Sequence, residues 1–337
     1  MTAGARAGCL AGITLIAALA GCGTLSSHAP AASSGRHGAT ADGSGPAASS
    51  AQKLPYDISG LLDPTDGKFF GVEPQGAPAF GPVTSFADSL GKRPDLIGQY
   101  VAWNSSFPAQ AVSTAWSYGA LYYIAWEPYQ TTLSAIADGQ SDAYITRFAQ
   151  AVRALNLPVA ISFGHEMNGN WYPWGISDNT AAQFAAAWRH IHNLFTQAGA
   201  GNVIWVWNPN VISSLPVVAL KPYYPGDAYV DWVGITGYFD NVGPHNFATL
   251  YGPTMTEVRQ FTAKPFIIAE TAVQTGPTDL REIRSLIAGV ENHPEVLGFS
   301  WFDYNKKGIN WQIESRPVLK NALARQLTGL QLIDPKK

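Results

Sequence analysis

Short apolar segments recur along the chain from about Leu54 onward, at intervals of roughly 30 residues. Each has the length of a strand buried on both faces, and amphipathic or alanine-rich stretches separate many of them. We predict eight strands, at Lys68–Pro74, Leu96–Trp103, Leu121–Pro128, Pro158–Glu166, Asn202–Pro209, Val230–Phe239, Pro265–Thr271 and Val296–Asp303. The clearest helices are predicted over Ser141–Leu155, Asn179–Ala198 and Thr278–Glu291, with Asp178 and Thr278 as expected N-caps of two of them.

Eight strands alternating with helices are what a (β/α)8 barrel requires, and the span slightly exceeds the typical barrel length of about 250 residues. The alternative is a doubly wound open sheet, which usually carries a glycine-rich phosphate loop after its first strand. The segment KFFGVEPQGAPAFGP is not such a loop. We therefore predict an α/β protein with a single (β/α)8 TIM barrel over residues 53–337.

Nearly every predicted strand is apolar until its C-terminal end, where a polar or aromatic residue stands. These residues are Glu73, Trp103, Glu127, His165 with Glu166, Asn208, Tyr238, Glu270, and Trp301 with Asp303. In a barrel all these ends meet at one rim, where active sites lie. A buried carboxylate is unfavourable unless it is paired, so several on one rim imply a shared polar site, while others of these residues cap loops.

Two of these carboxylates stand out. Glu166 follows the fourth predicted strand in the segment GHEMNGNWYPWG, and Glu270 ends the seventh in FIIAET. The two strands lie three apart in a ring of eight, so the side chains can face each other across the mouth. A separation of about 5–5.5 Å suits a retaining glycosidase and about 6.5–9.5 Å an inverting one. The residues alone do not fix this separation, so both outcomes stay open.

The segment GHEMNGNWYPWG closely resembles the acid/base segment of glycoside hydrolase family 26, best known for endo-β-1,4-mannanases. The resemblance extends from about Leu54 to the end of the chain, with AET, Tyr238 and Trp301 in the order that the family shows. It implies that Glu166 is the general acid/base and Glu270 the nucleophile of a retaining enzyme. It also implies that catalysis uses no metal or organic cofactor.

The same resemblance implies substrate-binding roles for five further residues. His165 is expected to bind substrate beside the acid, and Tyr238 to donate a hydrogen bond to the nucleophile. Trp301 is expected to form the platform under the sugar being cleaved, and Trp171 and Trp174 the aromatic wall of the cleft. For His165, Tyr238 and Trp301 the alternative is a purely structural role.

Other polar residues carry weaker signals. Asn208, and Glu127 with Trp126, are placed either to bind sugar hydroxyls or to cap loops, and the same choice is open for Asp231, Asp240 and Asp303. His190 and His192 are two apart in a predicted helix, so they face different directions and do not chelate one metal ion.

The resemblance to family 26 implies a retaining endo-β-glycanase whose first substrate is β-1,4-mannan, with mixed-linkage β-glucan and β-1,3-xylan as alternatives. Thr236 and Phe239 depart from the family pattern, which has an acidic residue and an asparagine there. Loss of a charge-assisted hydrogen bond at such a position alters which sugar is preferred. A hypothesis from another class is a non-catalytic carbohydrate-binding surface protein, against which the presence of both carboxylates argues.

The N-terminus is predicted to be a signal for export. Cys9–Leu19 is apolar but too short to span a bilayer, which takes about 20 residues. It ends in Leu19-Ala20-Gly21-Cys22, which resembles a bacterial lipobox and predicts a signal peptide over residues 1–21 and lipidation of Cys22; the alternative is an ordinary signal peptide. Residues 22–52 are rich in Ala, Ser, Gly and Pro and are predicted to be a flexible tether.

Charge and cysteine content limit the partners. The chain has 21 basic and 24 acidic residues, which gives no electrostatic footprint for nucleic acid. Cys9 and Cys22 are its two cysteines, so a mature lipoprotein would have no disulfide. We expect an exported monomer that binds polysaccharide, faces away from the cytoplasm, and meets the membrane through its N-terminal lipid alone or is released from it.

Overall fold

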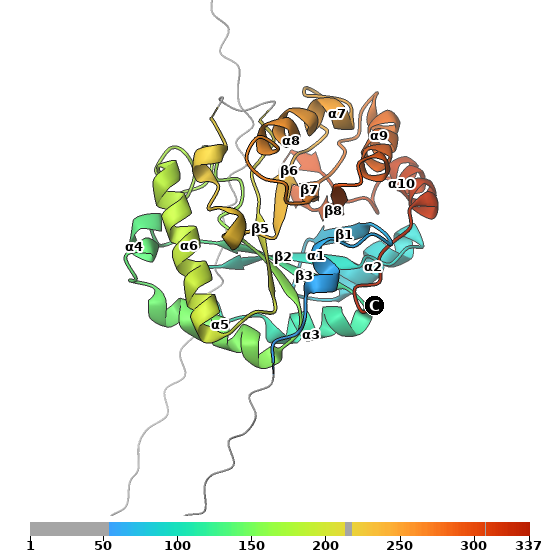
Figure 1. Cartoon of the computed structure of the whole chain (residues 1–337). Helices are drawn as coiled ribbons and strands as arrows, with labels where there is room; N and C mark the ends of the chain where they lie inside the picture. The colour runs from blue at the N-terminus through green and yellow to red at the C-terminus, as the bar shows by residue number, and fades with distance from the viewer. Residues whose placement is uncertain (1–53, 213–217, 307) are drawn as a thin grey trace, which may run out of the picture. The chain divides into compact units, whose positions relative to one another are not determined.

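Eight parallel strands form a closed barrel in the order of the chain (Figure 1). They are β1 (Phe69–Pro74), β2 (Leu96–Ala102), β3 (Leu121–Glu127), β4 (Val159–Phe163), β5 (Val203–Trp207), β6 (Trp232–Thr236), β7 (Phe266–Thr271) and β8 (Val296–Asp303). The ring closes where β1 pairs with β8, from Phe69 opposite Gly298 to Pro74 opposite Asp303. The predicted fold class is confirmed, and each predicted strand contains one observed strand.

This computed structural model describes residues 54–212, 218–306 and 308–337. The barrel is one compact unit, Pro55–Lys337. The predicted signal peptide, Cys22 and the predicted tether lie outside the described residues. Within the described ranges, no helix has both the length and the apolar character needed to cross a bilayer.

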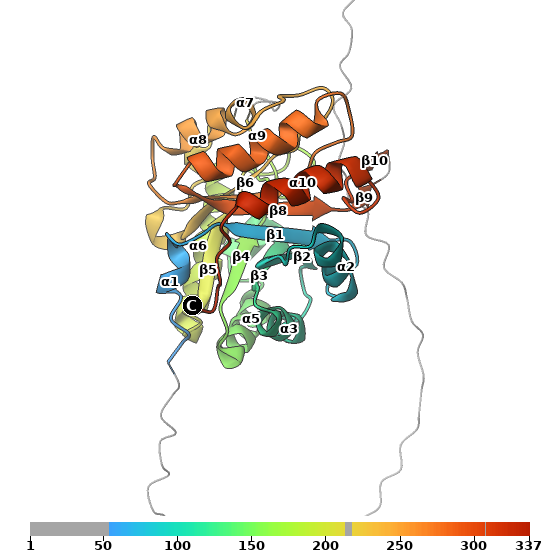
Figure 2. The same ribbon diagram turned by 90° about the vertical axis from the view of Figure 1, so that its right-hand side faces the viewer.

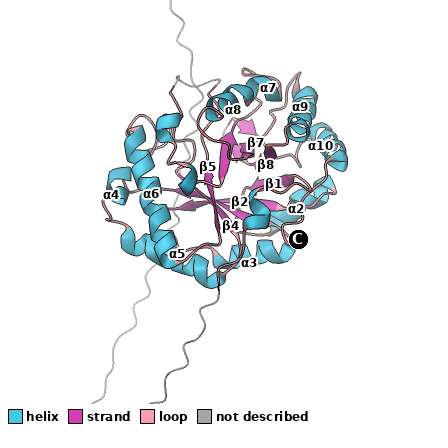
Figure 3. Ribbon diagram, in the orientation of Figure 1, coloured by secondary structure: helices cyan, strands magenta, loops and turns pink. Residues whose placement is uncertain are grey.

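Helices surround the barrel on its outside (Figure 3), except for the first, which packs against the interior cluster of the barrel. The helices are α1 (Ser59–Leu62), α2 (Gly81–Leu90), α3 (Ala109–Tyr118), α4 (Leu133–Ala137), α5 (Asp142–Leu155), α6 (Ala181–Ala198), α7 (Phe247–Leu250), α8 (Gly252–Val258), α9 (Asp279–Asn292) and α10 (Pro317–Gly329). Two 3-10 helices, η1 (Lys221–Tyr223) and η2 (Asp227–Tyr229), lie between β5 and β6, and a hairpin of β9 (Asn305–Lys306) and β10 (Ile309–Asn310) follows β8. Figure 2 shows α9 and α10 running along the outside of the barrel beside β8 and β1.

The three predicted helices are confirmed as α5, α6 and α9, but one predicted cap is wrong. Helix α6 is capped by Thr180, whose hydroxyl accepts a hydrogen bond from the Gln183 N–H while the Gln183 side chain accepts one from the Thr180 N–H. This reciprocal capping box satisfies two helix donors at once, so Asp178 is not the cap. Thr278 does occupy the N-cap position of α9, although its hydroxyl donates to Glu282 instead of capping the backbone.

The inside of the barrel is filled by side chains from alternate strand positions. This interior cluster consists of Leu61, Phe69, Leu96, Leu121, Tyr123, Ala125, Ala160, Ile204, Val206, Trp232, Ile267, Ala269, Leu297 and Ile333. Helix α1 contributes Leu61 to it, and the backbone oxygen of Leu62 accepts a hydrogen bond from Trp232 Nε1 at 2.9 Å. Because the interior is packed, ligands bind a barrel of this kind at the rim formed by the C-terminal strand ends.

A bulge in β8 determines which of its side chains reach that rim. Leu297 faces the interior, but the next inward positions are Ser300 and Phe302, which pair with the inward-facing Gly71 and Glu73. The extra residue is Gly298, whose φ of 153° favours glycine and where a Cβ would collide with the backbone of β1. Without this bulge, strict alternation from Leu297 would turn Trp301 inward.

Candidate active site

Glu166 lies three residues after the end of β4, in a left-handed backbone conformation with φ of 54°. Its N–H donates to the Asn208 carbonyl at 2.7 Å, and its carboxyl accepts hydrogen bonds from Asn210 Nδ2 and, at 2.8 Å, from Trp171 Nε1. Asn210 is itself held by Asn168, which accepts its backbone N–H at 2.8 Å. A non-glycine residue at positive φ persists where its surroundings over-determine it, so the backbone is held here while Asn210 and Trp171 orient the carboxyl.

Glu270 lies near the end of β7 and is 6% exposed, as is Glu166. Its Oε2 accepts a hydrogen bond from the Tyr100 hydroxyl, which extends from β2. The structure therefore brings Glu166 and Glu270 to the same end of the barrel, as the sequence predicted.

The two carboxyls are coupled electrostatically. Burial raises the pKa of both, and the charge of Glu166 helps raise the pKa of Glu270 to about 7. Hydrogen bonds from Asn210 and Trp171 oppose the rise at Glu166, and the charge of Lys306 opposes it at both. Two buried carboxyls that repel each other do not ionise together easily, which favours one protonated and one ionised group in the site.

Two further carboxyls line the same mouth. Glu127, at the end of β3, is 5% exposed, and burial together with the charge of Glu270 raises its pKa to about 8. Glu73, near the end of β1, is buried, and its pKa is raised well above the usual range by burial and by Glu270. Lys306 on β9 places its Nζ 4.4 Å from the centre of the Phe302 ring, and its positive charge acts on Glu127, Glu166 and Glu270.

Aromatic residues of the segment after β4 support the acid loop. His165 is buried beside Tyr172, with Nε2 3.2 Å from the hydroxyl, and burial lowers the pKa of His165 to about 3, so the ring is neutral. Trp174 is buried, stacks on Tyr172 with 4.4 Å between ring centres, and donates to the His165 carbonyl at 2.7 Å. Trp171 contacts Glu166 directly, whereas Trp174 supports the loop from the outside.

Two predicted roles are wrong. Tyr238 does not donate to the nucleophile: its hydroxyl has no hydrogen-bond partner, and its ring packs 5.1 Å from that of Trp311 and 5.6 Å from that of Phe302. Trp301 does not form a platform, because the β8 bulge places it on the outer face of the barrel. It is 0% exposed there and donates to the Trp311 carbonyl at 3.1 Å. The inner side of β8 presents Phe302, which stacks on Tyr304 just after the strand with 4.4 Å between ring centres.

The remaining strand-end residues make internal contacts. Asn208 is buried between Tyr123, whose hydroxyl it contacts at 3.3 Å, and Thr236, whose hydroxyl donates to its Oδ1 at 3.3 Å. Trp126 is buried on the outer side of β3 and stacks on Phe148. The three aspartates accept backbone N–H bonds and so fix local structure: Asp231 from Trp205, Asp240 from Val242 and Asp303 from Ile313.

The two helix histidines lie in different environments, as predicted. His190 contacts Asp142 at 2.6 Å, whereas the ring of His192 packs 5.3 Å from that of Trp205. Across residues 54–212, 218–306 and 308–337, no group of three or more His, Cys, Asp or Glu side chains is placed to hold a metal ion.

Sequence reasoning assigned no role to several residues that the structure places at this site. Tyr100 stands in the middle of a predicted strand, and Asn210 follows the fifth, so neither had a motif to mark it. Glu73 ends a strand, but no resemblance singled it out. Lys306 could be found only from the position of the β9–β10 hairpin.

Buried polar atoms without a partner gather at this mouth. They are Glu73 Oε1, Glu127 Oε1, Ser162 Oγ, His165 Nδ1, Tyr238 OH and Ser300 Oγ, which make up six of the eleven such atoms in the described part of the chain. Buried polar groups are normally hydrogen-bonded, so this concentration shows that the mouth is a polar site and not a simple packed core.

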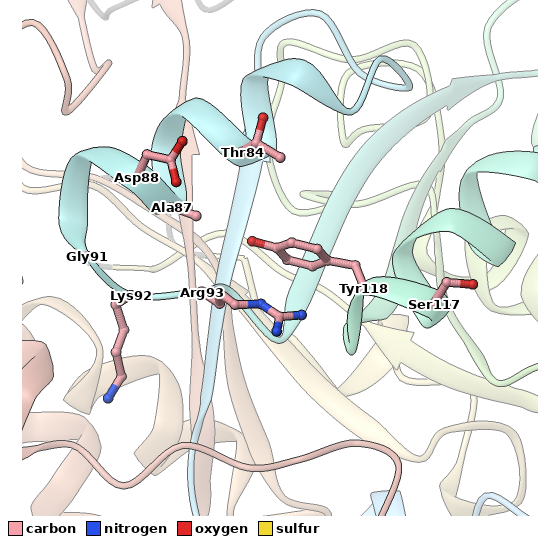
Figure 4. A pocket seen from close by; sticks show the side chains of 8 residues that line it. All are labelled: Thr84, Ala87, Asp88, Gly91, Lys92, Arg93, Ser117 and Tyr118. Carbon is pink, nitrogen blue, oxygen red and sulfur yellow. The ribbon is translucent and has the colours of Figure 1, made fainter.

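A separate pocket of about 700 Å³ lies on the outside of the barrel between α2 and α3 (Figure 4). Its lining includes Asp88, Lys92, Arg93 and Tyr118, and the Arg93 guanidinium lies 4.1 Å from the centre of the Tyr118 ring. It contains one carboxylate and lies at the N-terminal ends of β2 and β3, so it does not belong to the carboxyl site.

A (β/α)8 barrel with a coupled pair of carboxyls at the C-terminal ends of two strands has the architecture of a glycoside hydrolase. Comparison with known sequences assigns the family. The model of glycosyl hydrolase family 26 matches residues 121–316, more than half of the chain, and the chain belongs to this family.

Individual relatives differ in name. The chain is 32% identical to Endoglucanase H of Acetivibrio thermocellus over 256 residues, which is 71% of this chain and 28% of that protein. It is 28% identical to a mannan endo-1,4-beta-mannosidase of Bacillus subtilis over 188 residues, 53% of this chain and 46% of that protein. The chain thus spans less than half the length of these curated relatives.

Solved structures support the fold. The structure of a double mutant of a Cellulomonas fimi endo-beta-1,4-mannanase superposes with a TM-score of 0.64 at 15% identity. The match covers 85% of this chain and 79% of that structure.

Proposed function

We propose that this chain is a retaining endo-β-glycanase that hydrolyses a β-linked polysaccharide by double displacement. The observation that carries the proposal is the pair Glu166 and Glu270, buried at one end of the barrel and coupled through their charge. Each is held by hydrogen-bond donors from neighbouring strands or loops, so both are oriented before substrate binds.

In the first step, Glu270 attacks the anomeric carbon while Glu166 gives its proton to the departing glycosidic oxygen. The Tyr100 hydroxyl keeps the attacking carboxylate ionised and oriented. The apolar surroundings of Glu166, which include the buried Met167, favour its protonated form.

In the second step, water attacks the glycosyl-enzyme and Glu166 removes a proton from it. Once Glu270 is esterified it no longer carries a negative charge, so the repulsion between the two carboxyls is gone. Loss of that repulsion lowers the pKa of Glu166 and allows it to act as a base.

For the substrate we place β-1,4-mannan first, supported by the relatives named as mannanases. Mixed-linkage β-glucan is the second candidate, favoured by the higher identity to a protein named Endoglucanase H. The neutral Thr236, buried against Asn208, supplies no charge near the cleavage site at the position where the family pattern has an acidic residue. Hydroxyl recognition there depends on neutral hydrogen bonds, which discriminate less strongly than charge-assisted ones.

A comparison of rates on galactomannan, glucomannan, barley β-glucan and β-1,3-xylan, with product analysis, tests the substrate. We expect release of mixed oligosaccharides from at least one mannan. Cleavage of another polymer with both mannans untouched would reject the mannanase assignment and leave the glycanase mechanism. Binding without release of any product, beside a working control enzyme, would reject hydrolysis altogether.

We also propose that the chain is an exported lipoprotein anchored through Cys22. The support is the short apolar run followed by Leu19-Ala20-Gly21-Cys22. Mass spectrometry of the mature N-terminus should find a diacylglyceryl-modified Cys22, and Cys22→Ala should abolish the modification. An unmodified N-terminus at another cleavage site would overturn the anchor.

A further inference from the structure

Glu73 occupies an unusual place for a carboxyl that no step of the proposed mechanism uses. It lies on the inner face of β1, 1% exposed, and packs directly on the backbone of Gly98 in β2. A Cβ at Gly98 would lie 2.9 Å from Glu73 Cδ and closer still to its Cγ, so the glycine makes the room for this side chain. The carboxyl group faces Tyr100, Ser300 and Glu270.

The groups around Glu73 determine where its proton resides. Among the described residues, the titratable groups that act on it or feel its charge are carboxyl or phenol groups: Tyr100, Tyr123, Tyr304 and Glu270. Two neighbouring carboxyls in a dry site do not both ionise. The Glu270 anion accepts a hydrogen bond from the Tyr100 hydroxyl and is stabilised by the charge of Lys306, whereas Oε1 of Glu73 is buried and accepts no hydrogen bond. The proton of this pair therefore belongs on Glu73.

We propose that Glu73 is a positioning residue whose carboxylic acid group donates a hydrogen bond to Glu270. Glu270 then accepts from two donors on different strands, Glu73 on β1 and Tyr100 on β2, which fix its orientation and favour its ionised form. This inference rests on the proposed function in so far as Glu270 is the nucleophile.

The test compares Glu73→Leu with Glu73→Gln. Leucine fills a similar volume without a donor, so we expect kcat/KM to fall about tenfold or more and the acidic limb of its pH profile to move to higher pH. Glutamine keeps the shape and offers an amide N–H, so its rate and acidic limb should stay near those of the wild type. Thermal unfolding of both variants shows whether each is folded at the assay temperature.

The direction of the shift distinguishes the proposal from its alternatives. If Glu73 were ionised, both variants would remove a negative charge beside Glu270, and both acidic limbs would move to lower pH. A Glu73→Leu enzyme with an unmoved acidic limb would show a merely structural role. Either result overturns the proposal.

An infrared measurement tests the proton independently of catalysis. At neutral pH, the difference spectrum of wild type minus Glu73→Gln should contain the C=O stretching band of a protonated carboxyl group. Absence of that band overturns the proposal. A wild-type chain that cleaves no glycan would overturn the proposed function instead, and the band would still decide whether Glu73 carries the proton.

Discussion

Tyr100 and the residues around Glu166 show how single side chains prepare this site. Glu270 accepts from a phenol on β2, whereas Glu166 accepts from an amide and an indole on loops. These donors are neutral, so they orient each carboxyl without adding charge. Because the two carboxyls have different proposed roles, replacing each of them should have a different effect on activity.

Replacing each carboxyl by alanine should have different effects on different substrates. Glu166→Ala should keep more activity on aryl glycosides with acidic leaving groups than on polysaccharide, because such groups need little protonation, and azide should accelerate its turnover. Glu270→Ala should be almost inactive on both. If the leaving-group dependence appears in the Glu270 variant, the two roles are reversed.

The two tyrosines provide a matched pair of variants. Tyr100→Phe removes the donor to Glu270, so the pKa of Glu270 should rise. The acidic limb of the kcat/KM profile should then move to higher pH, and the rate should fall about tenfold or more. Tyr238→Phe removes a hydroxyl that has no partner, so it should leave the acidic limb in place. The opposite pattern in the two pH profiles would restore Tyr238 as the donor.

At this scale the sequence identified the two carboxyls but not their partners. Glu166 and Glu270 were predictable because they end apolar strands and one lies in a specific motif. The donor Tyr100 was not, because a tyrosine within a strand has the same pattern whether it packs or donates. Only the barrel register brings it to Glu270.

The elements themselves were largely predictable. Strands buried on both faces give continuous apolar runs, which is why all eight were found. Side-chain direction was not predictable in β8, because one bulge at Gly298 exchanges the inner and outer faces and turns Trp301 outward. The cap of α6 was misplaced by two residues, since both Asp178 and Thr180 are good capping residues.

The α6 boundary can be tested by two substitutions. Thr180→Ala removes one half of the capping box and should lower the free energy of unfolding by about 0.5–2 kcal/mol. Asp178→Ala, two residues upstream, should change it by less than about 0.5 kcal/mol. Urea unfolding of both variants gives the comparison, and an equal loss in both would contradict the assigned cap.

At the scale of the whole molecule, carboxyls buried at the C-terminal ends of the strands should make the stability of the fold depend on pH. Burial raises the pKa of both Glu127 and Asp303 to about 8. A raised pKa means that the folded state binds the proton more tightly, so this stabilisation is complete below the unfolded pKa and is lost as the pH rises toward about 8.

We therefore expect a lower Tm at about pH 8 than at about pH 5. Glu127→Gln should show a smaller difference in Tm between the two pH values, because one carboxyl with a raised pKa is gone. Replacement of the exposed Asp88 by Asn is the control and should show the same difference in Tm as the wild type. Calorimetry that finds the same pH dependence of Tm in the wild type and in Glu127→Gln would contradict this account of the buried carboxyls.

The central claim, a covalent double displacement on Glu270, is tested most directly by trapping the intermediate. The chain is incubated with an activated 2-deoxy-2-fluoro glycoside of the sugar released in the polysaccharide assay, and its peptides are mapped by mass spectrometry. The account predicts one glycosyl group per chain, attached to Glu270 and absent from Glu270→Ala. A label on Glu166, Glu127 or Glu73 instead would contradict it.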